Sequence, residues 1–331
     1  MSYLQETFEE RCETTGAPSY LSFFTTSISI LLLTISIPGN LLLILAVALD
    51  PNKNLRSPFN YLMSNLAVAD LIAGIVTGPL SVNFHIKEGL RKKMFKSEIY
   101  LFHMSYFISC TASILSLASL AIERYLAIRS PHKYRSKLTG RRILTTVAFI
   151  WLVATCLPFI YFKVHFITCA FILTNTTVLL ALATMGFTQG LMIWKLKRTH
   201  RHHPSKIENL PQVEIQSTPD YTNRTIDMET KITKMFLVVM TAVLCCYGPS
   251  AILIYVTSFC ESCSCTSLHW FRDLQCLFIL ANSSVNFFFY GLRSPRYRRA
   301  FTEILRLPGR RKYACNIAFG YNKPRKACTD V

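Results

Sequence analysis

The chain has 331 residues, of which 51% are hydrophobic and 16% are charged, and its mean hydropathy is +0.32. An average soluble domain is roughly 25% charged, so this chain is depleted in charge. Its 36 Lys and Arg against 18 Asp and Glu give a formal net charge of +18. Disordered chains and nucleic-acid-binding proteins are less apolar than this, whereas a membrane protein with a basic cytoplasmic side has both properties.

Long stretches free of charged side chains follow one another along the sequence. A charged side chain at the bilayer centre costs about 2.5–3.5 kcal/mol, and a helix needs about 20 residues to cross the hydrocarbon core. Seven stretches are long enough, and only the second contains a charged residue, Asp70: 14–49, 57–86, 99–122, 143–162, 164–194, 235–260 and 274–292. The runs are continuous and do not alternate as barrel strands do. We therefore predict an all-α membrane protein with a bundle of seven transmembrane helices.

The distribution of basic residues predicts the orientation. If the N-terminus is outside, the inner segments 50–57, 123–142, 195–234 and 293–331 hold 28 of the 36 Lys and Arg. Cytoplasmic loops carry this excess. We predict an extracellular N-terminus at 1–20, a seven-helix domain at 21–292 and a cytoplasmic part at 293–331. One outer segment opposes the trend with five basic residues: Lys87, Arg91, Lys92, Lys93 and Lys96.

Two cytoplasmic segments have a recognisable character. Residues 200–230 contain three prolines and mixed charges, which predicts a flexible loop. Residues 294–305 predict a short amphipathic eighth helix, with Pro295 near its first position and one apolar face made of Tyr297, Phe301, Ile304 and Leu305. We expect this helix to lie along membrane lipids of the inner leaflet, and an ordinary solvated tail is the alternative.

Polar residues inside the spans are costly and therefore indicate function. Asp70 is expected at a similar depth to hydroxyl and amide side chains of the third and seventh spans, namely Ser113, Asn282, Ser283 and Asn286. Oxygen ligands of this kind suit a hard cation. The alternative is that Asp70 is neutral, or that hydrogen bonds to it only pack the helices.

Two features at other depths suggest moving parts. Glu123-Arg124-Tyr125 ends the third span, and its adjacent acid and base predict a local ion pair that another helix can compete for. Pro249 removes a backbone hydrogen bond in the sixth span and predicts a hinge there.

These motifs, taken in order, resemble the rhodopsin-like (class A) G-protein-coupled receptors over about residues 20–305. The set is Gly39-Asn40, Leu66-Ala-Val-Ala-Asp70, Glu123-Arg124-Tyr125, Trp151, Pro249 and Asn286-x-x-x-Tyr290. The resemblance implies a plasma-membrane receptor that activates heterotrimeric G proteins by outward motion of the sixth helix. It implies activation roles for Glu123, Arg124, Tyr125, Tyr247, Pro249, Asn286 and Tyr290. It also implies an allosteric sodium ion at Asp70, Ser113, Asn282, Ser283 and Asn286.

The chain departs from the common pattern of that family in its cysteines and prolines. Ile99 stands where the third helix usually begins with a cysteine, the loop at 162–168 is very short, and the fifth span has no proline. This combination resembles the melanocortin receptor branch and, more loosely, the lysophospholipid and cannabinoid receptors. An oxidising exterior favours disulfides, with Cys260–Cys265 expected first and Cys12 paired with Cys260, Cys263 or Cys265 as another possibility. Free or palmitoylated thiols are the alternative.

Two activation motifs are also altered. Tyr247 replaces the usual tryptophan before Pro249, and Phe287 replaces the usual proline after Asn286. We expect a stiffer seventh helix and a changed amplitude of activation. A receptor-like protein with weak or no G-protein signalling is therefore an alternative.

The expected pocket excludes several ligand classes. Tyr106 stands where aminergic receptors have an acid, and no lysine between Lys234 and Lys312 is available for retinal. Leu80, Ile99 and His103 stand where melanocortin receptors hold calcium and a peptide arginine with acids. The pocket set that remains is mostly aromatic and apolar: Phe84, Phe102, His103, Tyr106, Phe107, Cys110, Tyr247, Ile254 and Leu277. We predict a lipid or a small, weakly charged extracellular ligand, with a peptide as the alternative, and helix packing as the alternative role of each residue.

Other function classes find little support in the sequence. We find no nucleophile–base pair, metal-ligand spacing or phosphate loop, so we do not expect an enzyme. Inverted repeats and broken helices, which are typical of transporters, are also not apparent. The basic cytoplasmic face suits anionic lipids and a G protein better than nucleic acid, and Cys315 and Cys328 are candidate lipid attachment sites.

Overall fold

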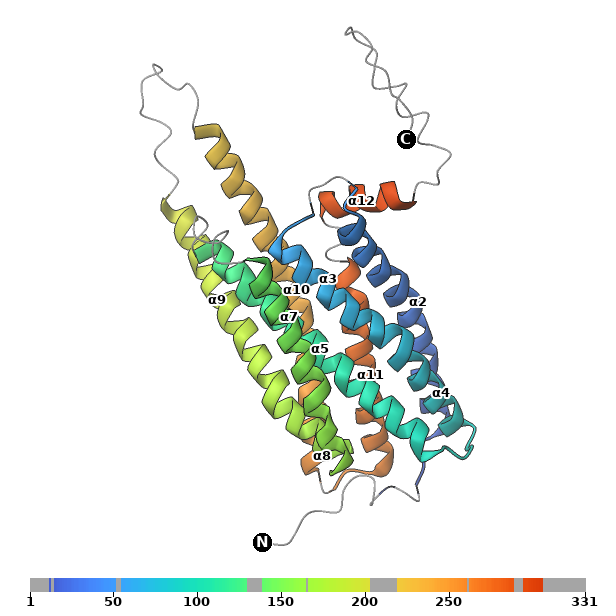
Figure 1. The fold of residues 1–331 in the computed structure, drawn as a ribbon. Helices are drawn as coiled ribbons and strands as arrows, with labels where there is room; N and C mark the ends of the chain where they lie inside the picture. Colours follow the sequence, from blue (N-terminus) through green and yellow to red (C-terminus); the bar gives the residue numbers. More distant parts are fainter. Residues whose placement is uncertain are drawn as a thin grey trace, which may run out of the picture.

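The computed structural model describes residues 12, 15–51, 55–129, 139–164, 166–202, 219–260, 262–288 and 294–305. Every regular element in these ranges is helical. Seven rods lie side by side (Figure 1), and their elements are α2 (Ser19–Leu49); α3, η1 and α4 (Pro58–Ile72, Ala73–Thr77 and Gly78–Gly89); α5 (Lys96–Arg129); α7 and η2 (Gly140–Cys156 and Leu157–Phe162); α8, η3 and α9 (Phe166–Leu173, Thr174–Val178 and Leu179–His202); α10 (Pro219–Phe259); and α11 (Cys265–Phe287). A short helix, α12 (Pro295–Leu305), follows.

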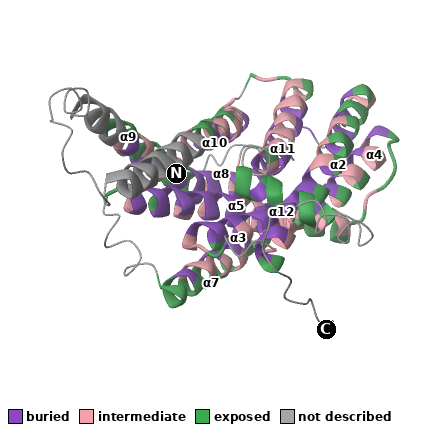
Figure 2. Cartoon of the chain, turned by 90° about the horizontal axis from the view of Figure 1, so that it is seen from above, coloured by how far each residue is buried: buried purple, intermediate pink, exposed green. Residues whose placement is uncertain are grey.

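Six of the seven rods are long and apolar enough to cross a membrane within the described part of the chain. The seventh, α11, is 23 residues long but carries polar and charged side chains, including Arg272 and Asp273, and it packs against α2 and α10. The central rod is α5, the span with the largest buried share (Figure 2). The predicted bundle of seven helices is therefore confirmed.

Buried amides and hydroxyls join the rods inside the bundle. Trp151 of α7 donates from Nε1 to Asn65 Oδ1 of α3 at 2.9 Å, and Asn65 Nδ2 donates to Ser116 Oγ of α5 at 2.8 Å. Asn40 of α2 donates from Nδ2 to the carbonyl oxygen of Ser283 in α11 at 3.0 Å. Because a lipid-filled surrounding offers no other partner, these bonds fix which faces of the helices meet.

Within the described residues, two rods contain an internal π-helical turn that the sequence did not indicate. In the second rod the turn is η1, next to which the Cβ position of Gly78 lies within 3 Å of Leu33. In the fifth rod the turn is η3, in a helix without proline. A π turn shifts the facing of all later side chains by one residue, so simple helical periodicity misplaces them.

Two disulfides close the end of the bundle at which α11 begins, called here the disulfide end; α12 lies at the opposite end (Figure 1). Cys12 is bonded to Cys265, and Cys260 to Cys263. The expected pair Cys260–Cys265 is therefore wrong, whereas the alternative of Cys12 with one loop cysteine is what the structure has. The reason is that the segment before α2 lies against the start of α11, where Thr15 O accepts from His269 Nε2 at 3.0 Å.

The predicted amphipathic helix is present, and its apolar face partly packs on the bundle. Tyr297 and Phe301 are buried, while Leu305 is exposed. Tyr297 donates from Oη to Asn60 Oδ1 of α3 at 3.2 Å, and burial raises the pKa of its phenol above the ordinary value. These contacts anchor α12 to α3.

The loop expected at 200–230 is wrong in its second part. The α9 helix ends at His202, but α10 begins at Pro219 and continues without interruption to Phe259. Proline is well suited to a first helical position, so Pro219 starts a helix here.

Phe287 makes the seventh rod depend on a glycine in the first. A Cβ atom added at Gly39 would lie 2.6 Å from Cγ and 2.8 Å from Cβ of Phe287. The Phe287 ring also stacks on Phe301 of α12, with ring centroids 5.9 Å apart. The large side chain that replaces the usual proline therefore fits because Gly39 has no side chain.

We expect Gly39→Ala to destabilise the protein by about 1–3 kcal/mol, because overpacking at Phe287 Cβ requires a backbone shift. In the double variant Gly39→Ala/Phe287→Gly, which removes the Cβ atom of residue 287 as well as its ring, that clash is absent, so the added cost of the alanine at 39 should vanish. Thermal unfolding of the four proteins in detergent measures this coupling. Additive effects of the two substitutions would contradict the packing described.

Candidate functional site

The carboxylate of Asp70 is fully buried and joins three rods. Its Oδ1 accepts from Ser113 Oγ of α5 and from Ser283 Oγ of α11, both at 3.0 Å. Its Oδ2 accepts from Asn286 Nδ2 of α11 at 2.7 Å. Four of the five residues assigned to the sodium site by resemblance are therefore in direct contact.

The fifth, Asn282, supplies polar atoms that have no partner within the described residues. Both side-chain atoms of Asn282 are buried without a hydrogen bond, as is Oδ1 of Asn286. Unsatisfied buried polar atoms are unusual and call for an unseen ion or water. Asn286 Oδ1 belongs to the amide that contacts Asp70, and an acceptor oxygen beside a buried carboxylate fits a hard cation such as sodium.

The ion pair that the sequence predicts lies near the C-terminal end of α5, toward the α12 end of the bundle. Arg124 donates from Nε to Glu123 Oε2 at 2.5 Å and from Nη2 to Glu123 Oε1 at 2.7 Å. Its guanidinium lies over the Phe59 ring of α3, 4.1 Å from the centroid. Tyr125 is half-buried, and its Oη accepts from Arg129 Nη1 at 3.3 Å. The local ion pair expected from the sequence is therefore present, with an aromatic ring of α3 against its arginine.

Two of the other residues with an expected role in activation lie in α10. Pro249 lies inside α10, and Tyr247, two residues before it, is almost completely buried. Tyr290 lies outside the described residues.

A cavity of about 650 Å³ opens at the disulfide end and is called here the outer cavity. Four residues of the expected pocket line it: Phe84, Phe102, His103 and Tyr106. Tyr161 and Phe166 line it as well; the His103 and Phe166 ring centroids lie 4.1 Å apart, and His103 Nδ1 lies 2.7 Å from Tyr161 Oη. One wall of the cavity is therefore aromatic.

A second cavity of about 30 Å³, called here the inner cavity, accounts for most of the other expected pocket residues. It is lined by Tyr106, Phe107, Cys110, Tyr247 and Ile254, among others. Leu277 lines neither cavity, and Cys276 lines the outer one in its place. Tyr106 and Gln275 line both cavities and are bonded to each other, with Gln275 Nε2 donating to Tyr106 Oη at 3.0 Å. This pair separates the two cavities.

The basic segment at 87–96 reaches the outer cavity with three of its five cations. Arg91, Lys92 and Lys96 are exposed and line the cavity, whereas Lys93 is exposed but does not line it. Lys87 is bonded to Glu98 at 2.7 Å. The rim is therefore basic, as the sequence suggested, and neither Lys87 nor Lys93 lines it.

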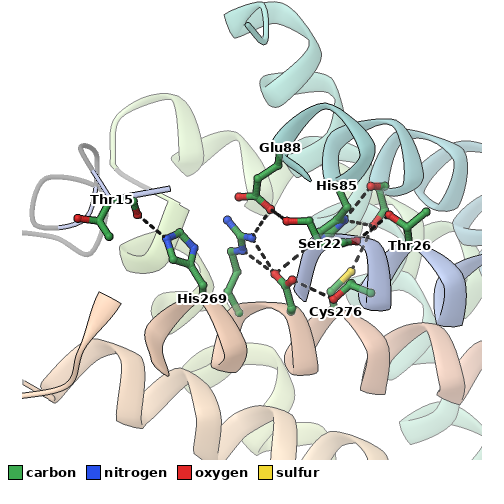
Figure 3. Close-up of polar contacts among 11 residues, drawn as sticks. Thr15, Ser22, Thr26, His85, Glu88, His269 and Cys276 are labelled. Carbon is green, nitrogen blue, oxygen red and sulfur yellow. Dashed lines mark hydrogen bonds and ion pairs between the residues drawn. The ribbon is translucent and has the colours of Figure 1, made fainter. Parts of the chain in front are cut away.

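A network of charged residues beside the outer cavity was missed in the sequence (Figure 3). Arg272 Nη2 lies 2.9 Å from Glu88 Oε2 and 2.8 Å from Asp273 Oδ1. Ser22 of α2 donates to Glu88 Oε2 at 3.0 Å, and Thr25 of α2 donates to Asp273 Oδ2 at 2.9 Å. The network joins α2, α4 and α11.

The only signal that could have found the network is His85 and Glu88, three residues apart and hence on one face of the second span. Asp273 sits at the edge of the seventh span. Sequence reasoning found no metal-ligand spacing, but His85, Glu88 and Asp273 place three candidate ligand atoms within 4.8 Å of one another. The fold thus brings together a candidate ligand set that no local spacing in the sequence indicates.

Comparison with known proteins identifies the family. The family model described as 7 transmembrane receptor (rhodopsin family) matches residues 39–290. The chain belongs to the rhodopsin family of seven-transmembrane receptors. The receptor is thus a multi-pass membrane protein of the G-protein-coupled class, and the class expected from its motifs is confirmed.

Several curated receptors are similar to this one. Adenosine receptor A2b of Gallus gallus is 26% identical over 84% of this chain and 87% of its own length. Melanocortin receptor 4 of Danio rerio is 27% identical over 85% of this chain and 83% of its own length. Dopamine receptor 4 of Caenorhabditis elegans is 36% identical, over 40% of this chain and only 24% of that receptor. Their names indicate different ligands, so the family is what these matches share.

The bond between His103 and Tyr161 gives a prediction about the receptor's outer cavity. Tyr161→Phe should destabilise it by about 1–3 kcal/mol, since His103 Nδ1 loses a buried partner. The matched control is Tyr100→Phe, whose ring packs edge-on against Tyr161 but is exposed, and whose effect should stay within about 0.5 kcal/mol. Thermal unfolding of the purified receptor compares them, and equal effects would refute the assignment.

Proposed function

We propose that the receptor has an extracellular N-terminus and transduces an extracellular lipid or small, weakly charged molecule to heterotrimeric G proteins. The observation that carries the proposal is the outer cavity, which combines an aromatic wall with the basic rim of Arg91, Lys92 and Lys96. An apolar body fits the interior, and an acidic group is attracted to the rim. A ligand with both parts is therefore the best match.

The two cavities suggest how a bound ligand reaches the sixth helix. A ligand in the outer cavity contacts Tyr106 and Gln275, the pair that separates it from the inner cavity. Tyr247 lines the far side of that separation and lies two residues before Pro249. A shift of Tyr106 therefore changes the packing of Tyr247 and turns α10 at its proline hinge.

Arg124 links the movement of α10 to the G protein at the other end of the bundle. In the described structure its guanidinium is bonded to Glu123 and covers the Phe59 ring. When α10 moves outward, Arg124 leaves Glu123 and becomes available to a G protein. Charge-assisted pairs of this kind favour one of two discrete arrangements.

The Asp70 site fits an allosteric sodium ion, with Asp70, Ser113, Asn282, Ser283 and Asn286 as the residues that would hold it. A bound sodium ion supplies the positive charge that a buried carboxylate otherwise lacks. Ser113, Ser283 and Asn286 orient the carboxylate toward α5 and α11.

A peptide ligand is the second candidate, because Glu88 and Asp273 also line the outer cavity. Both carboxylates are bonded to Arg272, so a basic peptide side chain would have to displace that guanidinium. A purely receptor-like protein without G-protein signalling is the outcome in which Arg124 has no effect.

The proposal is tested by measuring G-protein activation in membranes across all G-protein classes. We expect fatty acids or lysophospholipids to activate the receptor, and Arg124→Ala to remove basal and evoked activity. Lys92→Glu should weaken the response to acidic ligands roughly three- to tenfold, as expected for one partly screened charge. Lys93→Glu is the matched control, because Lys93 lies on the same segment but does not line the cavity.

Two outcomes would contradict the proposal. A response to cationic peptides alone would replace the ligand class with the peptide alternative. No difference between wild type and Arg124→Ala with any G protein would remove signalling itself.

The sodium site gives a separate prediction. Replacing potassium by sodium should raise the unfolding temperature of wild type and leave that of Asp70→Asn unchanged, since the neutral amide no longer attracts the ion. The matched control is Asp273→Asn, because Asp273 is also a buried carboxylate but lies at the disulfide end, away from Asp70. This variant should keep the sodium dependence. If Asp70→Asn retains it too, sodium does not bind at Asp70.

A further inference from the structure

The charged network beside the outer cavity contains a compact set of metal-type ligands. His85 and Glu88 lie one turn apart on α4, and Asp273 approaches them from α11. One ligand atom from each lies within 4.8 Å of the other two. The three residues also line the outer cavity, so small ions have access to them.

The orientation of His85 points its second nitrogen into this set. His85 Nδ1 lies 2.8 Å from the carbonyl oxygen of Ser81, and because a carbonyl only accepts, Nδ1 carries the hydrogen. In neutral imidazole Nε2 then has the lone pair, and it lies 3.3 Å from Asp273 Oδ1, another acceptor. The exposed fractions of the two side chains are 3% and 1%. Two buried acceptors that face each other are a place for a cation.

Arg272 is the cation that holds these carboxylates in the described structure. Its Nη2 lies within 3 Å of both Glu88 and Asp273, and its Cζ lies 5.3 Å from the Phe84 ring centroid, at the wall of the outer cavity. The cavity leaves room for the guanidinium to move away from the carboxylates. A metal ion at this place would therefore exchange with Arg272.

We propose that His85, Glu88 and Asp273 form a binding site for a divalent cation of the zinc type, with Arg272 as its competitor. One imidazole nitrogen and two carboxylate oxygens are ligands that zinc accepts, and three protein ligands leave a fourth position open to the cavity. Ser22 and Thr25 hold the carboxylates from α2, as outer partners commonly do at metal sites. The site does not depend on which ligand the receptor senses.

The test is a titration of the purified full-length receptor in nanodiscs with zinc chloride, followed by calorimetry and by thermal unfolding. His85→Gln and Glu88→Gln should each weaken zinc binding at least about tenfold, as loss of a site residue does. Arg272→Gln should have the opposite effect and tighten it about tenfold, because the competitor for the carboxylates is gone. His103→Gln, which changes another buried histidine of the same cavity, should bind zinc as wild type does.

The opposite sign expected for Arg272→Gln separates a metal site from a structural ion pair. Zinc bound elsewhere on the chain is common to all the variants, so only differences between them report on this site. If His85 is an imidazolium fixed to Asp273, Arg272→Gln lowers the unfolding temperature without tightening zinc binding, and the proposal fails. It also fails if His85→Gln and Glu88→Gln fold and bind zinc like wild type.

Discussion

The buried carboxylate of Asp70 is the constraint on which the rest of the bundle depends. Its three hydrogen-bond donors come from α5 and α11, so one group on α3 ties three rods at mid-depth. A buried charge is costly, and only a nearly complete set of partners makes it acceptable. The neighbouring bonds from Asn40 to Ser283 and from Trp151 to Asn65 extend the same core to α2 and α7. The bonds named here come from α2, α3, α5, α7 and α11, whereas α10 joins the bundle mainly by packing against α11.

The two ends of the bundle use charge differently. At the α12 end, Arg124 is paired with the residue next to it, so little chain has to move to release it. At the disulfide end, Arg272 is paired with Glu88, which lies 184 residues away, and the pair joins two helices. The Cys12–Cys265 disulfide closes the same end. A ligand or ion that competes for Arg272 therefore acts on helix packing directly.

Features that depend on neighbouring residues in the sequence could be predicted, whereas features that depend on distant segments could not. The spans are predictable because bilayer thickness fixes their length, and the partners of Asp70 follow from motifs in a known order. The disulfide pairing was not predictable, since it depends on where the segment around Cys12 lies. Leu277 was expected at the cavity, but its neighbour Cys276 lines it, because the sequence alone does not determine to within one residue which side of a helix faces inward. The Arg272 network combines residues from three helices that are far apart in the sequence but adjacent in space, so no local sequence pattern predicts it.

The central claim is that α10 moves relative to a core that Asp70 holds together. Pulsed spin-label distance measurements test this on the receptor alone and with nucleotide-free G protein. One label pair joins Arg129 of α5 to the first turns of α10, and the other joins Arg129 to Tyr61 of α3, an exposed residue. We expect the first distance to lengthen and the second to stay the same. A constant first distance, or equal changes in both, would contradict the account.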